Sequence, residues 1–163
     1  MEKWNLYLQD GTLTDKIHMR GVPVPQGFYH LVIHVWLMDE NGRYLIQRRA
    51  STVESYPGIW AATGGSAIAG ETSLEAVRRE TMEELGLNIS PKDFRLTKRF
   101  LRSDHLLDLW QTTIHSGFDE IFIPTEEVDE VAFRYPQEIV KMLRKGDFFP
   151  YWDEYFRTLR IEV

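Results

Sequence analysis

The chain has no cysteine, so disulfide bridges, thiolate metal sites and a cysteine nucleophile are all excluded. Basic residues are also few: 19 lysines and arginines stand against 25 aspartates and glutamates, a net charge of −6. Such a protein lacks the basic surface that nonspecific nucleic-acid binding requires. No apolar run approaches the roughly 20 residues that cross a bilayer, and the N-terminus lacks the order of a signal peptide. These absences predict a cytoplasmic protein that binds neither nucleic acid nor membrane.

What the composition does provide is enough apolar material for one core. The 163 residues are 43% hydrophobic, and chains of this size usually form one domain. No repeat, low-complexity stretch or linker marks an internal boundary. We therefore expect a single domain over residues 1–163, with the least patterned part, residues 1–28, as an N-terminal extension. The composition leaves a homodimer open.

Local patterns predict strands interleaved with helices. Residues 30–38 are rich in β-branched and aromatic side chains and precede a turn, which predicts a hairpin with a return strand at 44–48. Residues 94–100 and 106–114 are predicted as two further strands, with 121–123 as a candidate third. Helices are predicted at 72–85, from Pro136 to near Gly146, and at 151–159. This order predicts an α/β (α+β) fold with a mixed β-sheet between helices.

The helix predicted at 72–85 is unusually acidic. Glu80, Glu83 and Glu84 fall within an arc of about 100°. Like charges this close destabilise a helix unless a cation compensates them. Oxygen ligands without histidine or cysteine nearby favour a hard ion such as Mg²⁺ or Mn²⁺. The alternative is a solvated acidic face on which Arg78 and Arg79 form ordinary ion pairs, and the helix alone does not decide between the two.

The wider spacing of residues favours the metal site. The order is Gly65, five residues, Glu71, seven residues, Arg79-Glu80, two residues, Glu83-Glu84, one residue, Gly86-Leu87. This pattern, residues 65–87, resembles the signature box of the Nudix hydrolases, and the flanking elements extend the resemblance from about residue 30 to residue 143. An aliphatic residue is usual where this chain has Thr81. We expect a buried methyl group there and a hydroxyl bonded to the preceding turn.

The resemblance implies a Nudix fold and the divalent-metal-dependent hydrolysis of a diphosphate bond. The substrate would be a nucleoside diphosphate linked to another moiety or a related small-molecule diphosphate. By the same resemblance Glu80, Glu83 and Glu84 would bind Mg²⁺ or Mn²⁺, with the backbone carbonyl of Gly64 completing the ligand set. Arg79 would hold a neighbouring glutamate in position, and Glu71 and Gly65 would have supporting roles. A metal cluster there neutralises charge on phosphate oxygens and lowers the pKa of the attacking water.

A further metal-binding carboxylate is expected from a loop after the box. The acidic run at 125–130 precedes the segment where such a residue would lie. Glu127 is the first candidate by relative position and Glu126 the second. A solvated acidic loop is the alternative.

Residues 30–37, 42–50 and 57–60 look like the Nudix branch that contains isopentenyl-diphosphate isomerase. That isomerase needs a cysteine for proton transfer, and the matching position in this chain is Gly64. Of its metal-binding histidines one matches His30, whereas the others fall near Pro23 and Ser66. The resemblance therefore implies a hydrolase of the same subgroup. A non-catalytic ligand-binding module and a prenyl-diphosphate isomerase are the alternatives.

Two pairs of residues are candidates for contact with the substrate. His30 and His34 are four residues apart, so on a strand they point to the same face, where they either line a pocket or fill the core. Arg48 and Arg49 are candidate phosphate contacts, since a guanidinium can bind two phosphate oxygens at once. Surface ion pairing is the alternative for both arginines. Which diphosphate is bound does not follow from the sequence.

Overall fold

The computed structural model describes residues 1–163, and its centre is a mixed sheet of seven strands. They are β3 (His30–Met38), β4 (Tyr44–Arg49), β5 (Trp60–Ala61), β6 (Thr63–Ser66), β7 (Arg95–Leu101), β8 (His105–Thr113) and β9 (Val128–Arg134). β3 and β8 pair in parallel, whereas the other pairings are antiparallel. The predicted mixed sheet is confirmed, as is the hairpin of residues 30–38 with 44–48.

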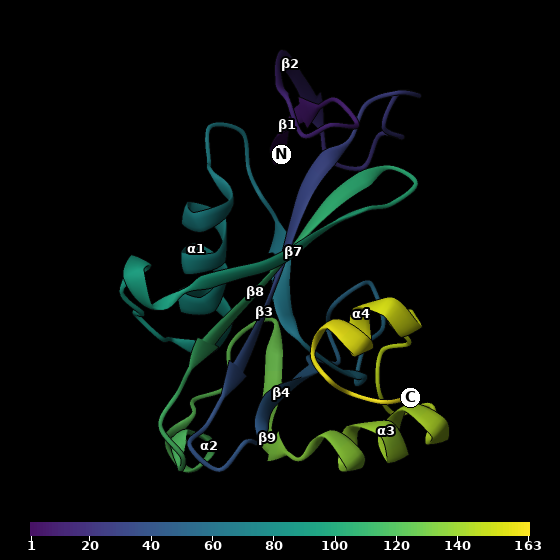
Figure 1. Cartoon of the computed structure of the whole chain (residues 1–163). Helices are drawn as coiled ribbons and strands as arrows, with labels where there is room; N and C mark the ends of the chain where they lie inside the picture. Colours follow the sequence, from purple (N-terminus) through teal and green to yellow (C-terminus); the bar gives the residue numbers. More distant parts are fainter.

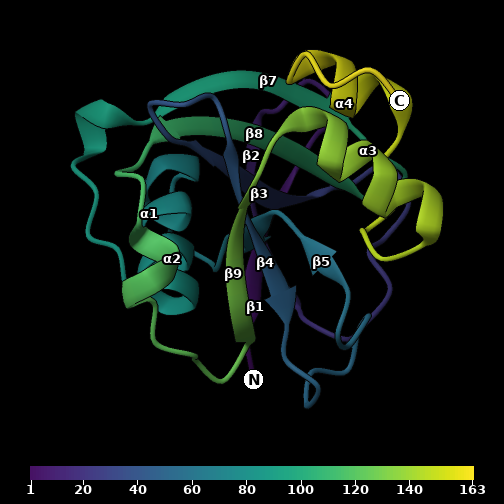
Figure 2. The same ribbon diagram turned by 90° about the horizontal axis from the view of Figure 1, so that it is seen from below.

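Helices cover both faces of this sheet. They are α1 (Ser73–Leu85), α2 (Phe118–Ile121), α3 (Pro136–Lys145) and α4 (Asp153–Thr158), with the short 3-10 helix η1 (Pro91–Asp93) before β7. Figures 1 and 2 show α1 on one side of β3 and β8, and α3 and α4 on the other. None of the helices is long and apolar enough to span a membrane.

Alternation along β3 divides the core into two layers. Odd-numbered residues from Leu31 to Leu37 pack with Val77 and the rest of the buried stripe of α1. Trp36 instead packs with Ile139 of α3 and with the aromatic residues of α4. Successive strand side chains point to opposite faces, so the even-numbered His30 and His34 lie on the face of α3 and α4.

Helix α1 begins and ends as its sequence predicts. Thr72 caps its first turn through a reciprocal pair of bonds with Glu75, and Gly86 ends it with a φ of 69°, a left-handed value that glycine adopts readily. Thr81 is fully buried, and its hydroxyl donates to the carbonyl of Val77 at 2.6 Å. The expected accommodation of Thr81 is therefore confirmed.

Residues 1–28, which the sequence presents as the least patterned part, contain a packed hairpin. It consists of β1 (Lys3–Tyr7) and β2 (Leu13–Met19). Trp4, Leu6 and Tyr7 are buried, and the backbone N–H of Ala69 donates to the carbonyl of Lys3 at 2.7 Å. The hairpin thus contacts the loop that leads into α1, because its apolar side chains need cover from the rest of the chain.

The strand proposed at 121–123 is wrong. Ile121 is the last residue of α2, and Ile121 and Ile123 are 74% and 80% exposed. These residues are therefore not part of the sheet. The strand lies further on, as β9, which pairs with β4. The acidic pair Asp129 and Glu130 obscures its apolar pattern in the sequence. The last helix, expected at 151–159, is shorter and spans Asp153–Thr158.

Candidate functional site

The acidic face of α1 packs against β6 and is largely buried. Glu80 is 7% exposed and Glu84 is 1% exposed, whereas the Glu83 side chain is 52% exposed. A solvated acidic face therefore does not describe Glu80 or Glu84. Carboxylates are seldom buried this deeply unless they are paired or bind a metal.

Glu84 is held by two donors from the sheet. The side-chain amide of Gln47 donates to its Oε2 at 3.0 Å, and the backbone N–H of Gly64 donates to the same oxygen at 3.1 Å. Even so, burial raises the pKa of Glu84 well above its ordinary value, and repulsion from Glu80 raises it further. The protein groups in contact with Glu84 thus do not fully compensate its charge.

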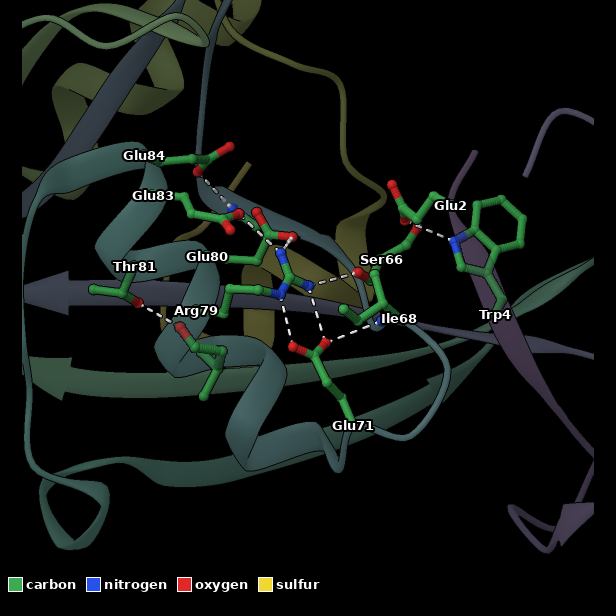
Figure 3. Close-up of polar contacts among 12 residues, drawn as sticks. Glu2, Trp4, Ser66, Ile68, Glu71, Arg79, Glu80, Thr81, Glu83 and Glu84 are labelled. Carbon is green, nitrogen blue, oxygen red and sulfur yellow. Dashed lines mark hydrogen bonds and ion pairs between the residues drawn. The ribbon is translucent and has the colours of Figure 1, made fainter. Parts of the chain in front are cut away.

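Arg79 is the cation that the protein itself supplies. Its guanidinium binds Glu71 at 2.7 Å, Glu80 at 2.8 Å and Glu83 at 2.9 Å, and it also donates to the carbonyl of Ser66 (Figure 3). The hydrogen bond to Glu71 is the largest of the effects that raise the pKa of Arg79. Glu71 in turn accepts the N–H of Ile68 at 3.0 Å. One neighbouring glutamate was predicted for Arg79, and the structure brings this arginine together with three.

The pKa of Glu80 shows that pairing with Arg79 does not compensate for the burial of this carboxylate. Burial raises the pKa to about 7, against an ordinary 4.5, even though Arg79 opposes the shift. The charges of Glu83 and Glu127 add to the effect. A cluster of carboxylate oxygens is the donor set that Mg²⁺ or Mn²⁺ prefers. A bound ion of this kind would relieve the repulsion between the carboxylates that contributes to their raised pKa values.

Two glycines of β6 leave room for close neighbours, Gly65 for the Glu80 side chain of α1 and Gly64 for β3. A Cβ atom at Gly65 would lie 2.4 Å from Oε1 of Glu80. A Cβ atom at Gly64 would lie 2.2 Å from the carbonyl oxygen of Ile33 and 2.7 Å from Cδ2 of His34. Any larger residue at either position would displace its neighbours. At Gly64, where the isomerase carries its cysteine, this backbone leaves no room for a side chain.

The acidic loop before β9 lies beside α1. Glu126, Glu127 and Thr125 line a hollow together with Glu83, and the Thr125 hydroxyl donates to the carbonyl of Glu84 at 3.4 Å. Repulsion from Glu127 contributes to the raised pKa of both Glu80 and Glu84. The first of the two predicted candidates thus lies near enough for its charge to act on the buried glutamates.

A cavity of about 490 Å³ opens on the α3 and α4 face of the sheet, next to the glutamates. Gly64 lines the cavity and also donates its backbone N–H to Glu84. The residues that line the cavity are His30, Val32, His34, Arg49, Ser55, Tyr56, Ala61, Ala62, Gly64, Arg102, His105, Leu107, Phe149, Pro150, Tyr151 and Trp152. They include two arginines and several aromatic residues but no carboxylate.

The structure separates the two predicted arginines. Arg49 lines the cavity, where its Nε donates to the carbonyl of Ser55 at 2.8 Å. Arg48 lies outside it and forms an ion pair with Glu130 at 3.1 Å, with 41% of its side chain exposed. For Arg48, therefore, the structure shows the surface ion pair that the sequence left as an alternative.

His30 belongs to a second group of metal-ligand side chains at the edge of the cavity. Ligand atoms of His30, Asp104 and His105 lie within 4.8 Å of one another. His30 stacks on Trp4 with ring centroids 4.0 Å apart, and its buried Nδ1 has no hydrogen-bond partner. Asp104 already binds Nδ1 of His105 at 2.7 Å. This group lies apart from the carboxylates of α1 and is not a substitute for them.

Several residues of the site were missed by the sequence analysis. Gln47 carries one signal, a polar residue in the middle of an apolar strand. Arg102 reaches the cavity because β3 and β8 pair in parallel, which aligns His30 with His105 and brings the turn before β8 to the cavity. Tyr151 and Trp152 were not missed, because the sequence marks both as aromatic residues that either stack on a ligand or pack in the core, and the structure places them in the cavity lining. No local pattern predicts these long-range alignments.

Comparison with known proteins agrees with this geometry. The NUDIX domain family matches residues 28–152. The Nudix hydrolase lin0387 of Listeria innocua is 35% identical over 153 residues, which cover 93% of this chain and 90% of that protein. An isopentenyl-diphosphate Delta-isomerase of Streptomyces griseus is 33% identical over 132 residues, or 75% of this chain and 65% of the isomerase.

The fold has a counterpart among solved structures. The crystal structure of DR0079 from Deinococcus radiodurans superimposes with a TM-score of 0.77 at 19% identity, and the match covers 98% of this chain and 99% of that one. The family match and the relatives point to one family, and the solved structure shares its fold. The chain therefore belongs to the Nudix hydrolase family, whose members generally hydrolyse diphosphate bonds with the help of divalent metal ions.

Proposed function

We propose that this protein hydrolyses the diphosphate bond of a nucleoside diphosphate linked to another moiety, or of a related small-molecule diphosphate, with bound Mg²⁺ or Mn²⁺. The observation that carries the proposal is the pair of buried carboxylates, Glu80 and Glu84, whose pKa values are raised. Burying uncompensated charge is unfavourable. A site built in this way fits a metal ion and is hard to explain without one.

The ion would be held by Glu80, Glu83 and Glu84 together with the carbonyl oxygen of Gly64, and Glu127 is a further candidate ligand. When bound, it would neutralise charge that develops on phosphate oxygens and lower the pKa of a water molecule. The protein's own part is to fix the ligands. Arg79 orients Glu80 and Glu83 through its two short ion pairs.

The cavity beside the glutamates is the proposed place for the rest of the substrate. Gly64 joins the two, and Arg49 can bind phosphate oxygens at the cavity wall. Its aromatic residues offer flat surfaces on which a ring system can stack. Two solved structures of similar fold are an Ap4A hydrolase of C. elegans and the NUDIX domain of Shewanella oneidensis NrtR, the latter complexed with ADP ribose.

The direct test is a panel of diphosphates incubated with the protein and either Mg²⁺ or Mn²⁺, with release of phosphate or a nucleoside monophosphate as the readout. We expect hydrolysis only when metal is present. Glu84→Gln keeps the shape of the side chain but removes a metal ligand, and should lower turnover at least about 100-fold. Arg48→Ala, which changes an arginine outside the cavity, is the matched control.

Two results would count against the proposal. A Glu84→Gln variant that hydrolyses a confirmed substrate at the wild-type rate would remove Glu84 from the metal site. Inactivity of the wild type across a broad panel, together with tight binding of one of the compounds, would instead indicate a non-catalytic ligand-binding module. Formation of dimethylallyl diphosphate from isopentenyl diphosphate is not expected, because the chain has no cysteine.

A further inference from the structure

His34 stands in the wall of the cavity, in the middle of β3. It is aligned with Gly64 of β6, and its ring lies edge-on to the ring of Tyr151, with centroids 5.2 Å apart. The absence of a side chain at Gly64 leaves the space that the His34 ring occupies. The sequence left open whether His34 fills the core or lines a pocket, and the structure places it in the cavity wall.

Two buried side chains fix the protonation state of this ring. The indole Nε1 of Trp36 lies 2.7 Å from the hydroxyl oxygen of Tyr155, and Nδ1 of His34 lies 2.9 Å from the same oxygen. An indole N–H can only donate. The Tyr155 oxygen therefore accepts from Trp36, and its own proton is free to donate elsewhere.

Tyr155 is fully buried, and Nδ1 of His34 is the only other group that its hydroxyl contacts. A buried hydroxyl that does not donate is unfavourable, so Tyr155 donates and Nδ1 of His34 accepts. A neutral imidazole that accepts at Nδ1 carries its proton at Nε2. Because Nδ1 accepts a hydrogen bond it carries no proton, and the ring is therefore neutral.

The Nε2–H group of His34 is left for a ligand. It makes no hydrogen bond within the protein, and unlike Nδ1 of His30 it is not sealed from solvent. The two arginines of the cavity, Arg49 and Arg102, share its lining, and no carboxylate does. The polar groups of the cavity wall therefore favour a ligand that brings oxygen acceptors.

We propose that His34 is a substrate-binding residue, a neutral imidazole whose Nε2–H donates a hydrogen bond to a phosphate, hydroxyl or carbonyl oxygen of the substrate inside this cavity. The proposal rests on the proposed function and narrows its substrate class. The substrate carries an oxygen-rich moiety, as nucleoside and sugar diphosphates do, rather than a hydrocarbon chain. A prenyl group at this place would leave the donor unpaired, which is unfavourable.

The first experiment measures the tautomer without any substrate. Two-dimensional ¹H–¹⁵N NMR of the histidine side chains at pH 7 should show His34 protonated at Nε2 and unprotonated at Nδ1. Tyr155→Phe removes the hydroxyl that donates to Nδ1 and should abolish this preference, and a melting curve checks that the variant is folded. If wild-type His34 is protonated at Nδ1, or at both nitrogens, the proposal is wrong.

The second experiment measures binding with two probes, the α,β-methylene analogue of ADP and the methylene-bridged analogue of isopentenyl diphosphate. The ADP analogue should bind more tightly and should shift the Nε2–H resonance of His34. His34→Phe should weaken its binding about 10- to 100-fold, and His34→Gln, which restores a donor, should recover part of that loss. His115→Phe, two residues after the end of β8 and outside the cavity, is the control.

The outcomes separate this inference from the proposed function. Equal affinity of wild type and His34→Phe for the ADP analogue, or preference of the wild type for the isopentenyl analogue, overturns the role of His34 even if diphosphate hydrolysis is found. Absence of hydrolysis in the substrate panel, with these binding results as expected, overturns the hydrolase proposal and leaves His34 as a ligand-binding residue.

Discussion

At single positions of this site, the residue type depends on the space that its side chain leaves for neighbouring groups as well as on the hydrogen bonds that it makes. Gly65 is the clearest example, because a Cβ atom there would lie 2.4 Å from the Glu80 carboxylate. Thr81 is the opposite case. It replaces the usual aliphatic residue, yet it is fully buried and its hydroxyl is bonded within the helix. A polar residue is tolerated in the core when its hydrogen bond is made locally.

We predict that Gly65→Ala weakens metal binding more than it destabilises the fold. The added methyl group displaces the end of a flexible side chain, the Glu80 carboxylate, so the backbone can stay in place while a ligand moves. Mn²⁺ affinity, measured by calorimetry, should fall about 10-fold or more, since a ligand displaced by about 1 Å is largely lost. Ser66→Ala, one residue further along β6, is the control. Unchanged Mn²⁺ affinity in Gly65→Ala would argue that Glu80 is not a ligand.

At the scale of elements, α1 combines a well-formed helix with an unfavourable charge distribution. Its capping box and its glycine C-cap stabilise the two ends. Its buried glutamates oppose folding when they are ionised, because two of them have raised pKa values. The caps of the helix thus offset part of the free energy of folding that the buried glutamates cost when no ligand is bound.

This conflict predicts a pH dependence for the metal-free protein. Glu80 has a folded-state pKa of about 7 against 4.5, so folding takes up a proton between these values. Its contribution to the free energy of unfolding is fully present below pH 4.5 and is lost as the pH rises through 7, by on the order of 3 kcal/mol. Denaturant unfolding of metal-free protein from pH 5 to pH 8 should show this loss.

The comparison with Glu80→Gln isolates the effect. His30 acts in the opposite direction, because burial lowers its pKa to about 4, so its contribution is present above pH 6.5 and is lost as the pH falls. The wild-type curve contains both contributions and that of Glu84, whereas the difference between wild type and Glu80→Gln contains the contribution of Glu80 and the part of the Glu84 shift that Glu80 causes. Parallel curves for the two proteins would contradict the raised pKa of Glu80.

At the scale of the molecule, the candidate site has two parts, the carboxylates and the cavity, which meet at strand β6. The carboxylates proposed as metal ligands gather where α1 meets β6, and the cavity with its arginines opens on the face of α3 and α4. Gly64 of β6 touches both, through its bond to Glu84 and its place in the cavity lining. A ligand in the cavity is thus adjacent to the proposed metal.

Metal should stabilise the whole molecule as well as the site. Binding to the folded state alone adds roughly 2.7 kcal/mol at a hundredfold excess over Kd, which raises the melting temperature by about 5 to 10 °C for a domain of this size. The rise with Mn²⁺ or Mg²⁺ should saturate and should be absent from the variant with Gln at positions 80, 83 and 84. Melting curves in matched NaCl correct for simple screening of a net charge of −6. An equal rise in the triple variant would exclude a metal site on α1.

Much of this protein follows from the sequence by itself. The bounds of α1, its caps, the cluster of glutamates on one arc and the accommodation of Thr81 all depend on residues within one or two helical turns of each other. Such relations are fixed by the geometry of the helix, so a local pattern is enough to predict them. The hairpin of β3 and β4 is local for the same reason.

Tertiary structure alone decided the rest. Three features depend on contacts between distant segments. They are the entry of Arg49 rather than Arg48 into the cavity, the effect of Trp36 and Tyr155 on the tautomer of His34, and the packing of a hairpin within residues 1–28. Tyr155, for example, is 121 residues from His34 in the sequence. The register of a parallel pair and the docking of a helix on a sheet are selected by the packing of the whole core. No local pattern in the sequence carries that information.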